Sequence, residues 1–322
     1  MEAQSLDALT TPVVLFFLLG CGAALLKSSL TVPEALAKGL TIYLMMAIGL
    51  KGGVEVATQG LTLQAASAGA LGIAFSFLAP IPVYLLLKTF GKLGNRDAGA
   101  VSAHYGSVSV VTFVTGAEYL GGIGMAPAGF MVAVLALMET PAIITGLLLA
   151  RRGSSSKPGP LSGLMHEAFL NGAVVLLVGS FVIGLLVGKE GFSTVAPVFE
   201  TGFRGALCIF LLDMGLLAVR RLRETRSLTW RLVLLGIGFP VALGFAGVTA
   251  ATLAGLDPGS AAAFGILAGS ASYIAVPAAM RMALPDADAG LYIGMSLGVT
   301  FPFNVLLGIP LYSFIASGLA GA

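Results

Sequence analysis

The chain has 322 residues, of which 57% are hydrophobic and only 10% are charged, and its mean hydropathy is +0.99. Soluble globular proteins carry about 25% charged residues, so this chain has too few charges to cover a surface in water. The composition indicates an integral membrane protein, and no region is large and polar enough to form a separate soluble domain. The net charge of +2 gives no sign of nucleic-acid binding.

Ten apolar runs of membrane-spanning length follow one another along the chain. They cover residues 11–27, 36–58, 62–88, 96–118, 127–150, 164–188, 195–219, 229–255, 259–281 and 289–318. The sequence therefore predicts an all-α membrane protein with ten transmembrane helices. The start of the chain, Met1 to Asp7, is acidic, whereas a cleaved signal peptide begins with a basic region. We therefore expect the first run to remain as a transmembrane helix.

Basic residues lie mainly at the odd-numbered loops between these runs. Fourteen are found there: Lys27, Lys38, Lys88, Lys92, Arg96, Arg151, Arg152, Lys157, Arg220, Arg221, Arg223, Arg226, Arg231 and Arg281. Only Lys51 and Lys189 are assigned to the even-numbered loops. Because cytoplasmic loops carry the basic excess, we expect a plasma-membrane protein with both termini outside.

Three landmarks recur in the same order in the two halves of the chain, at offsets of 161 to 164 residues. A proline precedes the second and seventh runs (Pro33 and Pro197), and a Gly-Ser stretch lies in the fourth and ninth (from Gly106 and Gly269). The third landmark is a proline shortly after a threonine, in the fifth and tenth runs (Pro141 and Pro302). Five spans are an odd number, so the second half must cross the membrane in the opposite sense. This predicts an inverted repeat, the architecture of many secondary transporters. The first repeat covers 1–150 and the second 161–322, with a short Gly- and Ser-containing cytoplasmic linker at 151–160.

The Gly-Ser stretches are the clearest candidates for a binding site. The first is Gly106-Ser107-Val108-Ser109, and the second is Gly269-Ser270-Ala271-Ser272. Glycine permits a non-helical turn and serine can cap the helix that restarts. A restarted helix exposes unpaired N–H groups and the positive end of its dipole, which attract anions. We expect helices 4 and 9 to be broken there, and the two breaks to meet within the bilayer and hold a small anion.

The serine hydroxyls of Ser107, Ser109, Ser270 and Ser272 would add donors to that site. The alternative is that Gly and Ser simply let two helices pack closely, with no ligand involved.

Glu139 is the most conspicuous single residue, because a carboxylate in the middle of a membrane span is costly and usually functional. It is a candidate sodium ligand or proton carrier; the alternative is a structural hydrogen bond to a neighbouring helix. Pro141 has no N–H, so the carbonyl of Leu137 loses its helical partner and becomes another possible cation ligand. Glu200 and Arg204, four residues apart, are interpreted as a local ion pair, with a substrate gate as the alternative.

The sequence contains no ATP-binding motif, and its one match to a catalytic motif lacks the expected secondary structure. Gly294-Met295-Ser296-Leu297-Gly298 matches the G-x-S-x-G pattern but lacks the strand–turn–helix context of a hydrolase. There is no Walker A motif, so ATP-driven transport is not expected from this chain alone, and no enzyme activity or organic cofactor is predicted.

The chain resembles the sodium-dependent bicarbonate transporters of cyanobacterial type (SbtA). The resemblance runs through most of the chain, and the stretches that carry it are Val32 to Ala35, Ile48 to Gly53, Tyr105 to Thr112, Met138 to Ala142, Phe203 to Gly205 and Gly269 to Arg281. It implies sodium-coupled bicarbonate uptake by a homotrimer. It also implies a core domain of spans 3–5 and 8–10 that moves against a scaffold of spans 1, 2, 6 and 7. The anion site of the family lies at its two serine-rich breaks, which correspond here to Gly106, Ser107, Ser109, Ser270 and Ser272.

This sequence departs from the family pattern in two places. Tyr273 stands where the family has an acidic residue after its second serine cluster, while Glu139 keeps a carboxylate at the matching position of the fifth run. The central loop has about ten residues where cyanobacterial members have a long one, so regulation by a PII-like soluble partner is not expected.

The sequence therefore predicts a secondary transporter that imports a small anion, bicarbonate by resemblance, together with sodium. Sodium is expected on hydroxyls, backbone carbonyls and Glu139, with Thr112, Tyr273 and Leu137 as further candidate ligands. The alternatives are a sodium- or proton-coupled symporter for a small organic carboxylate, a passive anion channel, and a membrane sensor or scaffold without transport.

Overall fold

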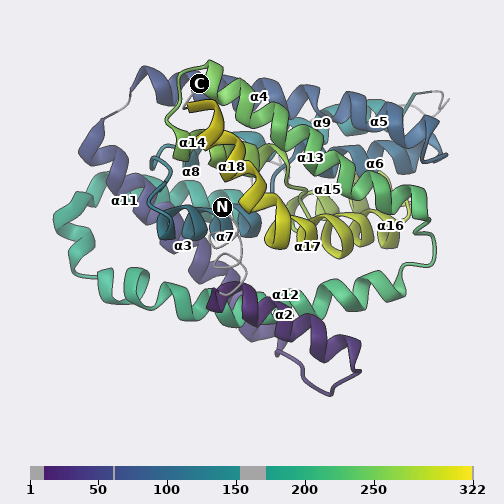
Figure 1. The fold of residues 1–322 in the computed structure, drawn as a ribbon, viewed down its shortest axis with the longest axis horizontal. Coiled ribbons are helices and arrows are strands. Elements are labelled where there is room, and N and C mark those ends of the chain that lie inside the picture. Colours follow the sequence, from purple (N-terminus) through teal and green to yellow (C-terminus); the bar gives the residue numbers. More distant parts are fainter. Residues whose placement is uncertain (1–10, 61, 153–171, 321–322) are drawn as a thin grey trace.

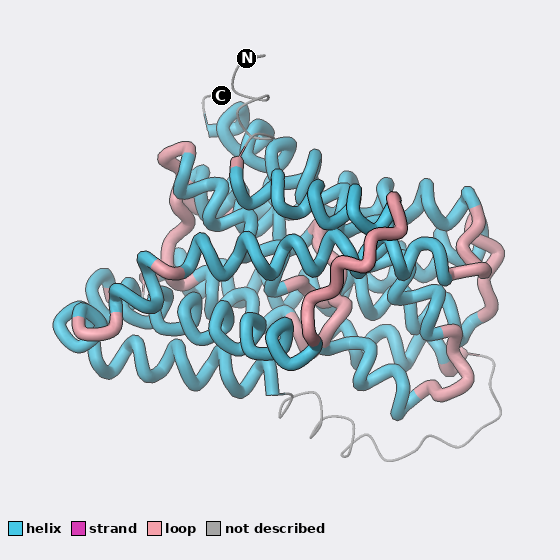
Figure 2. The backbone as a smooth tube through the Cα atoms, turned by 90° about the horizontal axis from the view of Figure 1, so that it is seen from below, coloured by secondary structure: helices cyan, strands magenta, loops and turns pink. Residues whose placement is uncertain are grey.

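The structure is a computed structural model that describes residues 11–60, 62–152 and 172–320. These residues form helices joined by short loops, and no strand occurs among them (Figures 1 and 2). Six helical segments in this part of the chain are long and apolar enough to cross a membrane. The expectation of an all-helical membrane protein is confirmed, whereas ten spans in an inverted repeat stay a prediction. Most of the predicted linker lies outside the described residues.

The first five predicted runs are helical in the structure. Their helices are α2 (Pro12–Leu25), α3 (Glu34–Gln59), α4 (Leu63–Leu78), α5 (Pro80–Thr89), α6 (Asn95–Gly106), α7 (Val110–Gly122), α8 (Met131–Met138) and α9 (Pro141–Ala150). The helices begin where the side chains favour it. Thr62 caps α4 by accepting a hydrogen bond from the N–H of Ala65, and Pro80 and Pro141 stand at the first positions of α5 and α9, where the fixed φ of proline suits a helix start.

The described part of the second half, from Gly172 onward, is also helical along the corresponding runs. Its elements are α11 (Gly172–Ser193), η1 (Pro197–Thr201), α12 (Phe203–Glu224), α13 (Trp230–Leu253), α14 (Pro258–Ala268), α15 (Ala275–Ala283), α16 (Ala289–Ile293), η2 (Gly294–Thr300), α17 (Phe301–Phe303), η3 (Asn304–Gly308) and α18 (Ile309–Ala320). Asp257 and Asp288 cap α14 and α16 through the N–H groups of Ser260 and Leu291. The windings η2 and η3 are π-helical and lie on either side of Pro302.

Two pairs of long helices pack backbone to backbone: α3 lies against α11, and α2 lies against α12. Glycine makes the close approach possible. A Cβ atom added to Gly20 of α2 would collide with the carbonyl of Leu212, and one added to Gly215 of α12 would collide with the carbonyl of Phe17. Small residues serve this purpose at helix contacts in lipid, where tight van der Waals packing replaces the hydrophobic driving force.

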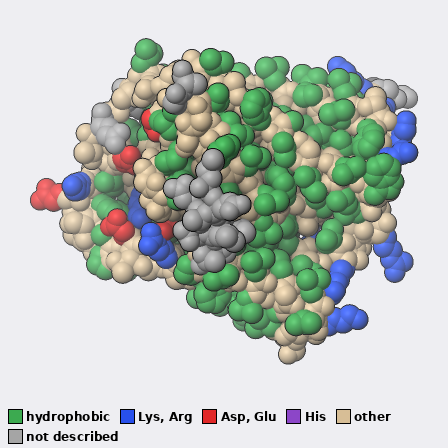
Figure 3. Space-filling view, viewed as in Figure 1, with side chains coloured by type: hydrophobic (Ala, Val, Ile, Leu, Met, Phe, Trp, Pro, Cys, Tyr) green, Lys and Arg blue, Asp and Glu red, His purple; other side chains and the backbone are tan. Residues whose placement is uncertain are grey.

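The two ends of the molecule differ in charge (Figure 3). In this view basic side chains alone gather at the end that holds α5, α6 and α16, and acidic and basic side chains are mixed at the opposite end. Hydrophobic side chains cover most of the surface between the two ends. This distribution is the one expected for a membrane protein whose basic end faces the cytoplasm.

The predicted ion pair between Glu200 and Arg204 is wrong. Arg204, in the first turn of α12, instead donates a hydrogen bond from Nε to Glu118 of α7, with which it forms an ion pair. The prediction assumed one continuous α-helix, but Pro197–Thr201 is wound as a π-helix, and a new helix begins at Phe203. The four-residue spacing therefore does not bring the two side chains together.

The contact between α2 and α12 can be tested with two glycines of α2. Gly20→Ala places a methyl group against the Leu212 carbonyl, and overpacking of this kind costs about 1–3 kcal/mol, which corresponds to a Tm lower by roughly 5 °C. Gly22→Ala is the control, because a Cβ there meets nothing within 4 Å. Thermal unfolding in detergent should separate the two variants; equal Tm values would contradict this packing.

Candidate functional site

The first interruption lies between α6 and α7. α6 ends at Gly106, Ser107 and Ser109 are extended, and α7 begins at Val110. Ser109 caps α7, because its Oγ accepts a hydrogen bond from the N–H of Thr112 at 3.2 Å. Ser107 does not cap the helix and instead donates its hydroxyl to the carbonyl of Glu139 at 2.9 Å. The fourth run is therefore broken at the predicted place.

The second interruption lies between α14 and α15. α14 ends at Ala268, and α15 begins only at Ala275. Ser270 donates its hydroxyl back to the carbonyl of Leu267 at 2.8 Å, and Ser272 Oγ accepts a hydrogen bond from the N–H of Val276 at 3.4 Å. The ninth run is thus broken as well, over a longer stretch than the first.

The two interruptions are hydrogen-bonded to each other. The N–H of Ser109 donates to Ser270 Oγ at 2.9 Å, and the N–H of Ser272 donates to the carbonyl of His104 at 2.9 Å. All four serines of the breaks are buried. The interruptions therefore meet, as expected, and we call this place the crossing: residues 104–112 and 267–276.

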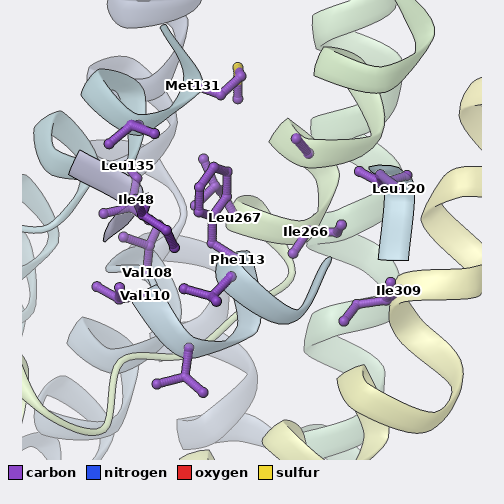
Figure 4. Close-up of a cluster of buried hydrophobic side chains, with 14 of the residues drawn as sticks. Ile48, Val108, Val110, Phe113, Leu120, Met131, Leu135, Ile266, Leu267 and Ile309 are labelled. Carbon is purple, nitrogen blue, oxygen red and sulfur yellow. The ribbon is translucent and has the colours of Figure 1, made fainter. Parts of the chain in front are cut away.

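The crossing is embedded in the larger apolar core of the molecule (Figure 4). Val108 and Val110 from the first break lie beside Ile48 of α3 and Leu135 of α8, and Leu267 from the end of α14 belongs to the same cluster. Water is therefore kept away from the exposed peptide groups of both breaks. Hydrogen bonds in such surroundings are stronger than in water, and groups left unpaired are costly.

The glycines of the motifs do not act as expected. Gly106 is still helical, and Gly269 keeps right-handed backbone angles, so neither needs the conformational freedom of glycine. Their role is close packing. A Cβ atom on Gly106 would lie 2.5 Å from Pro80 Cγ, and one on Gly269 would lie 2.5 Å from the hydroxyl of Tyr312.

A small enclosed cavity of about 10 Å³ lies at the crossing. Its walls come from both breaks, from α3 and from the α8–α9 turn: Met45, Val108, Ser109, Val110, Glu139, Ser272, Tyr273, Ile274 and Ala275. A cavity of this size holds about one water molecule or one ion of similar radius. It is too small for a polyatomic anion as it stands.

Two polar atoms beside this cavity have no hydrogen-bond partner. They are Glu139 Oε2 and the hydroxyl of Tyr273, which lies close to the Ser109 side chain without reaching hydrogen-bond geometry. Unpaired buried polar atoms are rare in folded proteins, and each one requires an explanation such as an absent ligand or water. The carboxylate and the phenol together can bind a cation or donate and accept protons.

Donors for an anion also remain at the crossing. Ser109 and Ser272 use their oxygens only as acceptors, so each keeps its own O–H to donate. Val110 and Val111 begin α7, and their N–H groups have no acceptor among the described residues. The helix N-termini of α7 and α15 add partial positive charge.

The helix on either side of Glu139 is supported by two hydrogen bonds that the sequence did not indicate. Pro141 interrupts the helix between α8 and α9. The hydroxyl of Ser76 on α4 bridges the interruption: it donates to the carbonyl of Met138 at 2.7 Å and accepts from the N–H of Ala142 at 3.2 Å. A serine four residues before Pro80, inside an apolar span, was the available signal.

A second polar network supports the other break and was also missed. Asn304 donates through Nδ2 to the carbonyl of Gly269 at 2.9 Å, and Tyr312 donates to Pro240 and lies 2.9 Å from Asn304 Oδ1. The signal was a buried asparagine and a buried tyrosine in an otherwise apolar run, whose partners lie 35 and 72 residues away.

The other predicted sodium ligands lie outside the cavity wall. The N–H of Thr112 bonds to Ser109 Oγ, and its side chain is buried within the crossing. Leu137, predicted as a ligand through its backbone carbonyl, does not line the cavity, and its role stays a prediction. His104 is packed: its ring stacks on Tyr292 and its Nδ1 lies 2.7 Å from the carbonyl of Ala100.

Two comparisons with known proteins bear on this site. A family model described as "Na+-dependent bicarbonate transporter superfamily" matches residues 12–317, a stretch that contains the whole crossing. The "Probable potassium transport system protein Kup" of Corynebacterium glutamicum is 26% identical over 186 residues, which are 55% of this chain. The match covers only 28% of that protein's length, so it indicates a likeness to transport proteins and no more.

The support of Glu139 by Ser76 can be tested by Ser76→Ala. The variant leaves the Met138 carbonyl and the Ala142 N–H buried without a partner, at a cost of about 1–3 kcal/mol. We expect a lower Tm and faster hydrogen exchange at the Ala142 amide. Ser67→Ala on the same helix is the control, since Ser67 bonds only to Gln64 in its own turn. If both variants behaved alike, Ser76 would not be the support described.

Proposed function

Since the chain belongs to the Na+-dependent bicarbonate transporter superfamily, we propose that it is a sodium-coupled symporter that imports bicarbonate across the plasma membrane, with the crossing as its substrate site. One observation carries this proposal: the two breaks bond to each other and line a cavity together with Glu139, whose Oε2 has no hydrogen-bond partner. Non-helical backbone at membrane depth occurs only where it is buried in protein or lines a cavity, and here it does both.

Bicarbonate binding requires hydrogen-bond donors that can bind the anion and release it without leaving a buried charge unpaired. The free hydroxyl protons of Ser109 and Ser272 and the first N–H groups of α7 are such donors. Neither break contains lysine or arginine. The site would therefore hold an anion with moderate affinity and release it, as a transporter must.

The carboxylate of Glu139 would supply the coupling to sodium. An ionised Glu139 repels an anion at the crossing, and a sodium ion bound beside it removes that repulsion. Two unit charges ~4 Å apart interact by about 4 kcal/mol at an effective dielectric constant of ~20, which corresponds to roughly a thousand-fold change in affinity. This is enough to make bicarbonate binding depend on sodium.

The conformation described here would be a closed one. The cavity accommodates an ion of sodium size, while a bicarbonate ion needs the two breaks to separate. Separation would cost the hydrogen bonds from Ser109 to Ser270 and from Ser272 to His104, and the carboxylate and hydroxyl groups of the substrate would replace them. Substrate and crossing thus compete for the same donors.

The larger arrangement follows the same proposal. Spans 3–5 and 8–10, which include α4–α9 and α13–α18, would form the mobile core, and α2, α3, α11 and α12 would form the scaffold. The tight pairing of α3 with α11 and of α2 with α12 supports a rigid scaffold. The inverted repeat, the homotrimer and the external termini belong to the proposal as well.

The substrate can be tested by uptake into proteoliposomes. We expect labelled bicarbonate to accumulate with sodium outside and not with choline, and Ser109→Ala and Ser272→Ala to reduce uptake about ten-fold or more, because each removes a hydrogen bond to a charged ligand. Ser102→Ala is the control, since Ser102 is equally buried on α6 but bonds only to Gly99.

Other results of the same assay would identify the rival functions. Uptake of formate or acetate in place of bicarbonate would indicate an organic carboxylate symporter. Ion currents that do not saturate with sodium would indicate a channel, and normal uptake in both serine variants would argue for a protein without this site.

The role of Glu139 can be tested by Glu139→Gln, which keeps the shape of the side chain and removes its charge. We expect the sodium concentration for half-maximal uptake to rise at least ten-fold, because the glutamine cannot neutralise a cation. Sodium-22 binding to the purified protein, without bicarbonate, is the direct measurement. An unchanged sodium affinity would remove Glu139 from the cation site.

A further inference from the structure

A second, much larger cavity of about 930 Å³ lies between the first turns of α2, the start of α12, and the helices α7 and α18. Its volume is within the range of small-molecule binding sites. Val13, Val14, Val305, Ile309 and Phe314 make one part of the wall apolar, and Glu118, Arg204 and Ser317 make another part polar. We call this cavity the vestibule.

The charged groups of the vestibule form an ion pair between helices that the proposed function assigns to different domains. Arg204 stands on α12, and Glu118 stands on α7. The arginine side chain is 71% exposed, whereas that of Glu118 is 22% exposed. An ion pair with such an exposed partner contributes little to stability, so another anion can replace the carboxylate with small loss.

The vestibule reaches close to the crossing along α7. Thr115 lines the vestibule and Val110 lines the small cavity. Five residues of helix separate the two, which is about 7.5 Å at 1.5 Å per residue. No other helix in the described part of the chain contributes to both cavities.

Three aromatic rings connect α2 to the second break. The ring of Phe301 lies 5.6 Å from that of Phe17 on α2 and 5.3 Å from that of Tyr273 in the second break. Phe17 and Phe301 are both fully buried. These rings therefore connect α2, which also lines the vestibule, to Tyr273 in the wall of the crossing cavity.

We propose that the vestibule is the outward-facing access chamber of the transporter, and that Arg204 recruits the incoming anion by exchanging Glu118 for it. This inference rests on the proposed function and adds a second, transient anion site to it. The vestibule is lined by the start of α2 and by the last turns of α18, close to the two termini, which the proposed function places outside.

The exchange has a specific consequence for how tightly the anion is held. An anion held by Arg204 leaves Glu118 unpaired on α7, the helix whose N-terminus lies at the crossing. Repulsion between the freed carboxylate and the anion weakens the binding to Arg204, so the anion is held only transiently.

Access to the vestibule can be measured independently of the substrate. In a chain with Cys21→Ala and Cys208→Ala, a single thiol is introduced by Ser317→Cys, because Ser317 is exposed and lines the vestibule. Membrane-impermeant methanethiosulfonate reagents, one anionic and one cationic, are applied from outside. We expect both to react, the anionic-to-cationic rate ratio to fall about three-fold or more with Arg204→Gln, and the ratio to rise with Glu118→Gln. Ser193→Cys, outside the vestibule, is the control whose ratio should not change.

Uptake kinetics then test recruitment itself. We expect Arg204→Gln to raise the KM for external bicarbonate about five-fold or more with little change in the maximal rate, Arg204→Lys to restore part of it, and Glu118→Gln to lower the KM. If both neutralising variants changed only the maximal rate, and by the same factor, the pair would be a structural lock and the proposal would fail. It would also fail if the Ser317→Cys thiol did not react from outside.

Thiol labelling and bicarbonate uptake test the access chamber and the proposed function separately. Charge-dependent labelling without any bicarbonate uptake would uphold the access chamber and overturn the bicarbonate assignment. Sodium-dependent bicarbonate uptake with a Ser317→Cys thiol that does not react from outside would support the bicarbonate assignment and overturn the access chamber.

Discussion

Peptide groups that leave a helix inside a bilayer find no water to bond, and the crossing depends on how this chain satisfies them. The two breaks act as partners for each other: the N–H of Ser109 bonds to Ser270, and the N–H of Ser272 bonds to the carbonyl of His104. Neither break could persist alone at this depth without unpaired groups. The same pairing brings two helix N-termini and the Glu139 carboxylate around one small cavity, so the requirement of stability and the geometry of a binding site have a common origin.

Around the crossing, hydroxyl groups pair with peptide groups that prolines leave without a helical partner. Pro141 breaks the helix before α9, and Ser76 bridges the gap. Pro240 lies within α13 and cannot bond to the carbonyl of Gly236, which instead accepts a hydrogen bond from Thr300 at 2.6 Å. Thr300 in turn lies 2.7 Å from the hydroxyl of Tyr105, one residue before the end of α6. Each proline therefore creates an acceptor or donor that ties a distant helix to the neighbourhood of the breaks.

The sequence predicted the helical class, the places of both breaks and the meeting of the two, because local motifs and membrane-length runs carry that information. It did not predict the roles of Ser76 and Asn304, because a polar residue in an apolar run does not show which distant residue it bonds to. The pairing of Arg204 was predicted wrongly because a four-residue spacing has meaning only in a regular α-helix. Gly106 and Gly269 were located correctly for the wrong reason, since packing against neighbours, and not backbone freedom, requires them.

The π-helical windings on either side of Pro302 have a consequence for how this chain can vary. They set the rotation of the segment that follows, and with it the direction of Asn304 and Tyr312 toward Gly269 and Pro240. Adding or removing one residue would turn everything downstream by about 100°. The length of 294–308 is therefore fixed more strictly than its side chains, because the number of residues in this stretch determines how Asn304 and Tyr312 support the second break.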